Sequence, residues 1–184
     1  MEKNVDVIVV GGGHAGIEAS SAIARLGSKV LLITLKKNQI GEMSCNPAIG
    51  GLGKGHLVRE IDALDGVMGR AIDQSGIQFR MLNKSKGPAV HGPRSQADRS
   101  LYKKSVKEIL LNQQKIRVIE GFVDDIIIDN QEIKGVILNN DKKFFCKSLV
   151  ITTGTFLGGK IFLGNEIFEA GRIGDKSSSK LSQR

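Results

Sequence analysis

The chain has 184 residues, of which 40% are hydrophobic and 25% charged, as expected for an ordinary globular protein. No apolar run approaches the ~18 residues that a membrane-spanning helix needs, and the first residues lack a signal peptide's apolar core, so we expect a cytoplasmic protein with no membrane association. The net charge of +8 favours an anionic partner, whereas an aromatic content of 4% does not suggest an extended base-stacking platform.

Residues 5–34 predict a strand, a glycine-rich turn, a helix and a second strand. The turn fits the pattern G-x-G-x-x-G, with Gly11, Gly13 and Gly16 at its fixed positions. In this motif the first glycine permits a tight turn and the second lets the backbone approach a pyrophosphate. The third lets the helix pack close to the strand. Because the motif follows an apolar strand and opens a helix, it predicts a dinucleotide-binding unit.

The helix after this turn is expected to bury one face. Apolar residues recur along it at the helical period and end before Gly27, a candidate for the helix C-cap. The predicted buried face consists of Ala15, Ala19, Ala22, Ile23 and Leu26.

An acidic residue is missing where a dinucleotide fold usually carries one, at the end of the second strand. The sequence there reads Thr34-Leu35-Lys36-Lys37. The two lysines can meet a 2′-phosphate, as in an NADP enzyme, or can be solvent-exposed, and the Thr34 hydroxyl can bond the ribose. This position alone therefore does not identify the cofactor.

Residues 38–94 are rich in glycine, show few strand signals and are too long for an ordinary loop, which predicts a functional insertion. Ser95-Gln96-Ala97-Asp98 then has the form of a capping box and predicts a helix. The expected buried face of that helix consists of Tyr102, Val106, Ile109 and Leu110.

Strand patterns return from residue 116. IRVIEG at 116–121 is expected to be followed by a three-stranded antiparallel meander of 123–130, 132–140 and 142–148. LVITTG at 149–154 then predicts a separate apolar strand that returns to the parallel sheet. The residues from Gly171 onward are polar and loop-like.

Basic residues concentrate within 80–117, where the acidic residues are Asp98 and Glu108 alone. They form either a surface for phosphates or a solvated helix face with a basic loop. These basic residues are Arg80, Lys84, Lys86, Arg94, Arg99, Lys103, Lys104, Lys107, Lys115 and Arg117.

The order of these elements resembles flavoproteins of the glutathione-reductase type. This resemblance implies an α/β Rossmann-like FAD/NAD(P)-binding fold, with a parallel sheet, a three-stranded antiparallel meander, and FAD extended across the first motif. Residues 1–184 would then form an FAD-binding domain with the glycine-rich insertion at 38–94. Disulfide oxidoreductases of that group carry two close cysteines in the insertion, whereas Cys45 is alone here.

Several segments closely resemble the glucose-inhibited division protein A family, which supplies the FAD-binding subunit of a tRNA uridine 5-carboxymethylaminomethyl modification enzyme. Besides the opening GGGHAG, they are GEMSCNPAIGG at 41–51, GKGHLV at 53–58, KGPAV at 86–90, RSQADR at 94–99, TTGTFLGGKI at 152–161 and GRIGD at 171–175.

The resemblance implies an enzyme that uses FAD, reduced by NADH, and a one-carbon unit from methylenetetrahydrofolate. Together with a GTPase partner subunit, the family modifies the 5-position of the wobble uridine in certain tRNAs. It also implies a homodimer. The family is several hundred residues longer, so the resemblance implies that this chain is an amino-terminal part.

Site residues follow from the same resemblance, by position. Cys45 matches a cysteine proposed as a nucleophile or redox-active thiol; alternatively, it is a small buried residue lining the flavin pocket. Cys146, in an alternating strand, is expected to be structural, and no disulfide framework is indicated. No metal site is implied. The FAD-binding positions are Gly11, Gly12, Gly13, His14, Ala15, Gly16, Val123 and Ser178.

Two alternatives stay open from sequence. A folate- and FAD-dependent tRNA uridine methyltransferase shares the fold and cofactors, but the segments 44–47 and 86–90 argue against it. A truncated, inactive FAD-binding module is the non-enzymatic alternative. His91 stands where many family members have arginine, which weakens any anion-binding role of that position at neutral pH.

Overall fold

The computed structural model describes residues 5–43, 46–172 and 174–184. Contacts divide the chain into two units, one of which interrupts the other in sequence. We call residues 1–38 with 115–184 the sheet unit, and residues 39–114 the inserted unit. None of the helices in the described ranges is long and apolar enough to cross a membrane.

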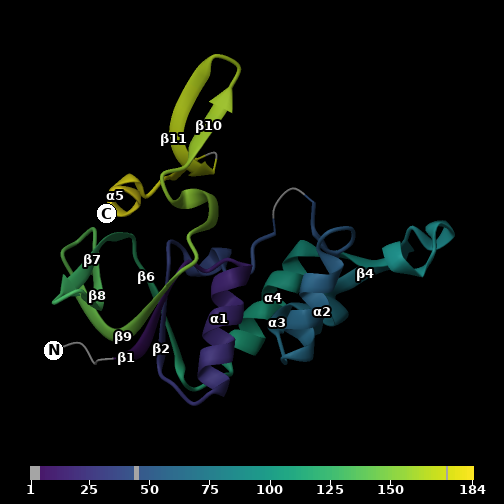
Figure 1. Cartoon of the computed structure of the whole chain (residues 1–184), viewed down its shortest axis with the longest axis horizontal. Coiled ribbons are helices and arrows are strands. Elements are labelled where there is room, and N and C mark those ends of the chain that lie inside the picture. Colours follow the sequence, from purple (N-terminus) through teal and green to yellow (C-terminus); the bar gives the residue numbers. More distant parts are fainter. Residues whose placement is uncertain (1–4, 44–45, 173) are drawn as a thin grey trace. The chain divides into compact units, whose positions relative to one another are not determined.

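The sheet unit is built on a six-stranded sheet with the order β6-β2-β1-β9-β8-β7 (Figure 1). Neighbouring strands are parallel from β6 to β9, and β8 and β7 continue the sheet in antiparallel pairing. The predicted α/β fold with a parallel sheet and a meander is therefore confirmed. The strands are β1 (Val5–Val10), β2 (Val30–Thr34), β6 (Ile116–Glu120), β7 (Val123–Asp129), β8 (Glu132–Leu138) and β9 (Lys143–Ile151).

Strand β9 is continuous where the sequence indicated two strands. Its first residues pair antiparallel with β8, with Phe144 opposite Val136. From Cys146, which lies opposite Val5, it pairs parallel with β1. The predicted break after residue 148 is wrong, because the change in hydrophobic pattern marks a change of neighbouring strand and not the end of a strand.

The core of the sheet unit lies on both faces of its parallel strands, and every residue of β2 is buried. Side chains alternate along a strand, so Val9 and Leu32, which are both fully buried, lie on the face of the sheet opposite to Ile8. The other face holds a buried cluster from the parallel strands, the meander and the last helix: Ile8, Val10, Leu31, Ile33, Val123, Val136, Leu138, Phe144, Cys146 and Leu181.

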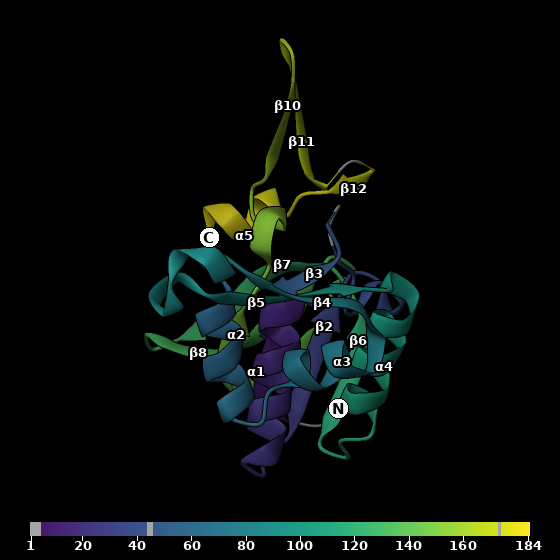
Figure 2. The same cartoon turned by 90° about the vertical axis from the view of Figure 1, so that its right-hand side faces the viewer.

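The residues after β9 form structure that the sequence did not indicate. A short helical turn, η4 (Gly154–Phe156), leads into a hairpin of β10 (Lys160–Leu163) and β11 (Glu166–Arg172), which extends away from the six-stranded sheet (Figures 1 and 2). Strand β12 (Asp175–Lys176) and helix α5 (Ser179–Gln183) follow. The expectation of a loop from Gly171 onward is therefore wrong. Leu181 supplies the apolar contact that holds α5, because it belongs to the buried cluster.

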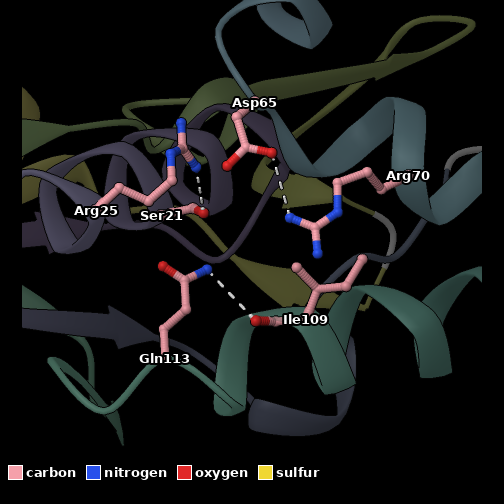
Figure 3. Close-up of polar contacts among 6 residues, drawn as sticks. All are labelled: Ser21, Arg25, Asp65, Arg70, Ile109 and Gln113. Atoms are coloured by element: carbon pink, nitrogen blue, oxygen red, sulfur yellow. Dashed lines mark hydrogen bonds and ion pairs between the residues drawn. The ribbon is translucent and has the colours of Figure 1, made fainter.

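Helix α1 (His14–Arg25) follows the glycine-rich turn, but its predicted buried face is wrong. Ala15 and Leu26 are exposed, and Leu26 lies just beyond the helix as its C-cap. Ile17 and three small residues face inward instead, and the Ser21 hydroxyl accepts a 2.8 Å hydrogen bond from Arg25 (Figure 3). The buried residues are Gly16, Ile17, Ser20 and Ser21.

Helix α1 ends close to where the sequence predicts, but the C-cap is Leu26 and the predicted Gly27 is the residue that follows it. Gly27 adopts a φ of +91°, in the left-handed region that favours glycine. The Gly27 N–H donates to Ala24 O (3.0 Å), and the Ser28 N–H donates to Ile23 O (3.2 Å). These two bonds satisfy carbonyls that the helix leaves without a partner.

The inserted unit combines a small antiparallel sheet with helices, although its sequence shows few strand signals. Its strand order is β3-β5-β4. β4 is hard to recognise from its pattern because nearly all its residues are exposed. The elements are β3 (Ala48–Gly50), α2 (Gly55–Ala63), α3 (Val67–Ser75), β4 (Gly76–Leu82), β5 (Gly92–Ala97) and α4 (Arg99–Leu111), with helical turns η2 (Lys84–Lys86) and η3 (Pro88–Val90). A further helical turn, η1 (Lys37–Gln39), spans the boundary between the two units in the sequence.

Helix α4 forms where it was predicted, but its cap differs. Ser95 lies within β5, and the N-cap is Asp98, whose carboxylate accepts a 2.8 Å hydrogen bond from the Leu101 N–H. The predicted buried face is confirmed at Tyr102, Val106 and Leu110, while Ile109 is half-buried and Ser105 is buried. Side-chain interactions also support α3 and α4. Arg70 of α3 pairs with Asp65, which precedes that helix, at 3.5 Å, and Gln113, which follows α4, donates to Ile109 O at 3.4 Å (Figure 3).

Candidate functional site

The glycine-rich turn lies at the carboxyl edge of the parallel strands. Because β1, β2, β6 and the second part of β9 run in the same direction, Val10, Thr34, Glu120 and Ile151 end at this one edge. In open α/β sheets, ligands bind outside this edge. The edge is therefore the candidate site.

Two glycines of the turn are required by close backbone approaches. Gly11 has a φ of +114°, and a Cβ there would lie 2.3 Å from Thr152 O. A Cβ on Gly16 would lie 1.8 Å from Gly11 O. Both distances are far below van der Waals contact, so no larger residue fits without moving the backbone.

Gly13 is different, because its surroundings are open. Apart from Gly13 itself and its two neighbours in the chain, no residue that the structure describes has an atom within 4 Å of the place that a Cβ would take. Its φ is −77°, which any residue can adopt. The fold itself does not require glycine here. In a pyrophosphate-binding turn, the second glycine is instead required by a ligand that approaches the backbone closely.

Thr152 holds the turn from the neighbouring strand. Its N–H and its hydroxyl donate to Val10 O, at 2.8 and 2.9 Å, and the hydroxyl also lies 3.3 Å from Gly11 O. The Gly11 N–H donates to Ile33 O at 2.8 Å. The turn is therefore fixed between β2 and the end of β9. Thr152 lies in a segment that resembles the family, but that segment did not indicate a contact with the turn, because the partners of Thr152 lie about 140 residues earlier.

The first turn of α1 is suited to an anion. It contains no acidic residue, and the N-terminal N–H groups of a helix have no partner within the helix. Burial lowers the pKa of the His14 imidazole, which favours its neutral form. Gly12 is half-buried and Ala15 is exposed. Attraction for a phosphate here therefore comes from the backbone and not from a charged side chain.

The structure brings together Val123 and Ser178, which the sequence resemblance singled out separately. The Ser178 hydroxyl donates to Val123 O at 3.2 Å, and both residues are buried. Val123 follows the end of β6 by three residues and belongs to the same buried cluster as Val10 and Ile33. Both predicted residues therefore lie near the carboxyl edge, although their role in cofactor binding stays a prediction.

An acidic side chain does lie beside the end of β2, but it comes from another strand. Glu120 is the register partner of Thr34 on the neighbouring β6. Its carboxylate accepts a 2.7 Å hydrogen bond from the backbone N–H of Lys37. Thr34 is buried. The sequence contained no signal for this pairing, since Glu120 follows Thr34 by 86 residues.

Cys45 lies outside the described residues, but the residues that follow it are held in the inserted unit. Asn46 accepts a 3.1 Å hydrogen bond from Arg94, and Pro47 O accepts one of 2.7 Å from the Ala97 N–H. Cys146 differs, because it is buried in β9 and burial raises the pKa of its thiol. His91 lies 3.2 Å from Lys84 O through its Nε2.

The basic region divides into paired and more open cations. Lys103 forms a 2.5 Å ion pair with Glu42, and Lys104 lies 3.8 Å from Glu108 one helical turn away. Lys84 and Lys86 are exposed on η2, between β4 and β5.

Comparison with known proteins identifies the family. A family model described as glucose inhibited division protein A matches residues 6–184. The chain belongs to this family. It is 58% identical, over 182 residues, to the tRNA uridine 5-carboxymethylaminomethyl modification enzyme MnmG of Granulibacter bethesdensis, covering 97% of this chain and 29% of that protein.

Solved structures agree with this assignment. Aquifex aeolicus GidA superposes with a TM-score of 0.92 at 50% identity, covering 98% of this chain and 30% of the solved chain. A GidA-related protein from Thermus thermophilus matches with a TM-score of 0.69 at 20% identity, over 97% of this chain and 66% of that one, and shows the fold alone. The 184 residues thus span less than a third of the MnmG and GidA chains that they match.

Proposed function

We propose that this chain forms the FAD-binding part of an enzyme that adds a carboxymethylaminomethyl group to the 5-position of the wobble uridine in tRNA. The observation that carries the proposal is the open space at Gly13, on a turn that backbone interactions otherwise fix tightly. The turn lies in a chain that is 58% identical to an enzyme named for this modification, and this identity supports the same function.

In this proposal the turn from Gly11 to Gly16 holds the FAD pyrophosphate through backbone N–H groups and the start of α1. Gly12, His14 and Ala15 contribute backbone positions to that site. Val123 and Ser178 bind further along the cofactor. FAD, when bound, supplies reversible two-electron chemistry, with NADH and methylenetetrahydrofolate as co-substrates of the full-length enzyme.

Cys45 is the proposed catalytic residue, acting as a thiolate nucleophile or redox-active thiol during uridine activation. A cysteine in a glycine-rich segment can be exposed, and its thiolate is the reactive form. Cys146 does not compete for this role, because its thiol is buried and its pKa is raised.

The proposed partners are tRNA, a GTPase subunit and a second copy of the enzyme, in the cytoplasm. They follow from the family resemblance. The positive net charge is consistent with binding to a polyanion such as tRNA.

Two measurements on the protein at its full natural length test the proposal. The first is a visible absorption spectrum with an FAD titration, because a bound flavin colours the protein yellow. A colourless protein that takes up NADPH and no FAD would contradict the cofactor assignment. The second is nucleoside analysis of tRNA from cells with and without the gene. Loss of the 5-carboxymethylaminomethyl group supports the function, whereas loss of 5-methyluridine points to the folate-dependent methyltransferase.

A further inference from the structure

The end of β2 lacks the carboxylate that usually binds the ribose of a dinucleotide, and the neighbouring strand supplies one. Thr34 ends β2, and Glu120 ends β6 directly opposite it in the register. Adjacent strands lie about 4.8 Å apart. A glutamate side chain on β6 is therefore long enough to reach the space beyond the end of β2.

The Glu120 carboxylate is held at this edge by the chain that leaves β2. One of its oxygens accepts the Lys37 N–H at 2.7 Å, while the side chain as a whole is exposed. An ionised carboxylate can accept about four hydrogen bonds, so one N–H leaves capacity for ligand hydroxyls. The Gly121 N–H donates to Thr34 O at 2.9 Å, which fixes the two strand ends together.

We propose that Glu120 binds the adenosine ribose of FAD, in place of the acidic residue that is absent after β2. The inference rests on the proposed FAD function. Hydrogen bonds from ribose hydroxyls to a carboxylate are charge-assisted and hence stronger than neutral ones. Glu120 is thus a residue that determines which adenosine ribose the site accepts.

A purely structural role is the competing explanation, because the bond to Lys37 also supports the start of η1. The two roles predict different changes in affinity for a ligand that lacks a ribose hydroxyl. Removal of a structural support weakens every flavin dinucleotide by the same factor. Removal of a ribose-binding group affects only ligands that carry the hydroxyl.

The test measures dissociation constants by flavin fluorescence, in the protein at full natural length, for FAD and for its analogue with a 2′-deoxyadenosine ribose. The wild type should bind the analogue about 10- to 100-fold more weakly than FAD. Glu120→Ala should weaken FAD by a similar factor and bind both ligands equally. Glu120→Gln, which keeps an acceptor for Lys37, should lose less.

Glu132→Ala is the matched control, since this exposed glutamate on β8 pairs with Lys134 and should leave both constants unchanged. If Glu120→Ala weakens both flavins by one factor, or leaves FAD binding unchanged, the inference is wrong while the FAD function stands. If the wild type binds no FAD, the proposed function fails, and the inference fails with it.

Discussion

Glycines of one motif have different physical reasons to be glycine. Gly16 is required by the fold, because a Cβ there would lie 1.8 Å from Gly11 O. At Gly13, by contrast, a Cβ would meet no described residue within 4 Å beyond its two neighbours in the chain. The sequence motif treats the two alike, whereas the structure shows a packing requirement at Gly16 and none at Gly13, where we propose that the cofactor requires glycine.

Gly13→Val is therefore expected to fold and to lose FAD. Its valine would occupy the space that the pyrophosphate needs, while its φ of −77° suits any residue. Gly16→Ala is expected to lose thermal stability, whether or not FAD is present. Circular dichroism melting and flavin absorbance measure the two effects. A Gly13→Val protein that retains stoichiometric FAD would contradict the assignment of the turn.

Cys45→Ser is expected to keep FAD and to lose most uridine modification. A serine hydroxyl is similar in size but far less ionised than a thiol near neutral pH, so nucleophilicity is lost while packing is kept. Modification is measured by nucleoside analysis of tRNA treated with each variant.

Cys146→Ala provides the control, because this buried residue belongs to the core cluster and has no proposed chemistry. The folded Cys146→Ala variant should keep its uridine-modifying activity. Unchanged modification by Cys45→Ser would make Cys45 a packing residue, and loss of FAD would place it in cofactor binding instead.

At the scale of elements, the start of α4 shows how a sequence motif can identify a helix and misplace its cap. Ser95-Gln96-Ala97-Asp98 fits a capping box, but Ser95 belongs to β5, where it lies opposite Phe79 and Ile49. The Ser95 hydroxyl is buried and has no hydrogen-bond partner within the described residues. The pairing of β5 with its two neighbours takes Ser95 away from the helix, and Asp98 caps it.

Asp98→Ala should destabilise the inserted unit by about 1 kcal/mol, the usual cost of losing an N-cap side chain. Ser95→Ala should be neutral or stabilising, because it removes a buried hydroxyl without a partner. Urea denaturation followed by circular dichroism compares the two. The reverse order of stabilities would restore Ser95 as the cap.

At the scale of the whole molecule, the excess positive charge is unevenly available. The cation of Lys103 is occupied by an ion pair with Glu42 within the inserted unit. Lys84 and Lys86, on the exposed η2, have greater freedom to meet phosphates. The proposed binding of tRNA would therefore depend on which lysines are exposed as well as on how many there are.

The Lys84→Ala/Lys86→Ala double variant should bind tRNA more weakly, and similarly for different tRNA sequences. The slope of log affinity against log salt should fall by about 1 for each phosphate that the variant no longer binds. Lys142→Ala/Lys143→Ala is the matched control, because it removes the same charge from an exposed turn and strand of the sheet unit. If the slope of log affinity against log salt is the same in both variants, the lysines of η2 make no specific contribution to tRNA binding.

The sequence by itself determined the βαβ unit, the meander, the position of α4 and the family. The first three depend on interactions between residues close in the chain, such as the glycine-rich turn after β1, the left-handed Gly27 after α1 and the alternation of the strands. The segments that resemble the family are likewise contiguous. Local patterns are sufficient for such features because their physical causes are local.

Only the tertiary structure decided which side chains meet at the carboxyl edge. Strand register places Glu120 opposite Thr34, 86 residues earlier, and brings Thr152 against Gly11. The same holds for Ser178 and Val123, which are 55 residues apart. These interactions depend on strand order and register in the sheet, which no short segment encodes. The residues that surround the proposed cofactor site are therefore set by the fold as a whole.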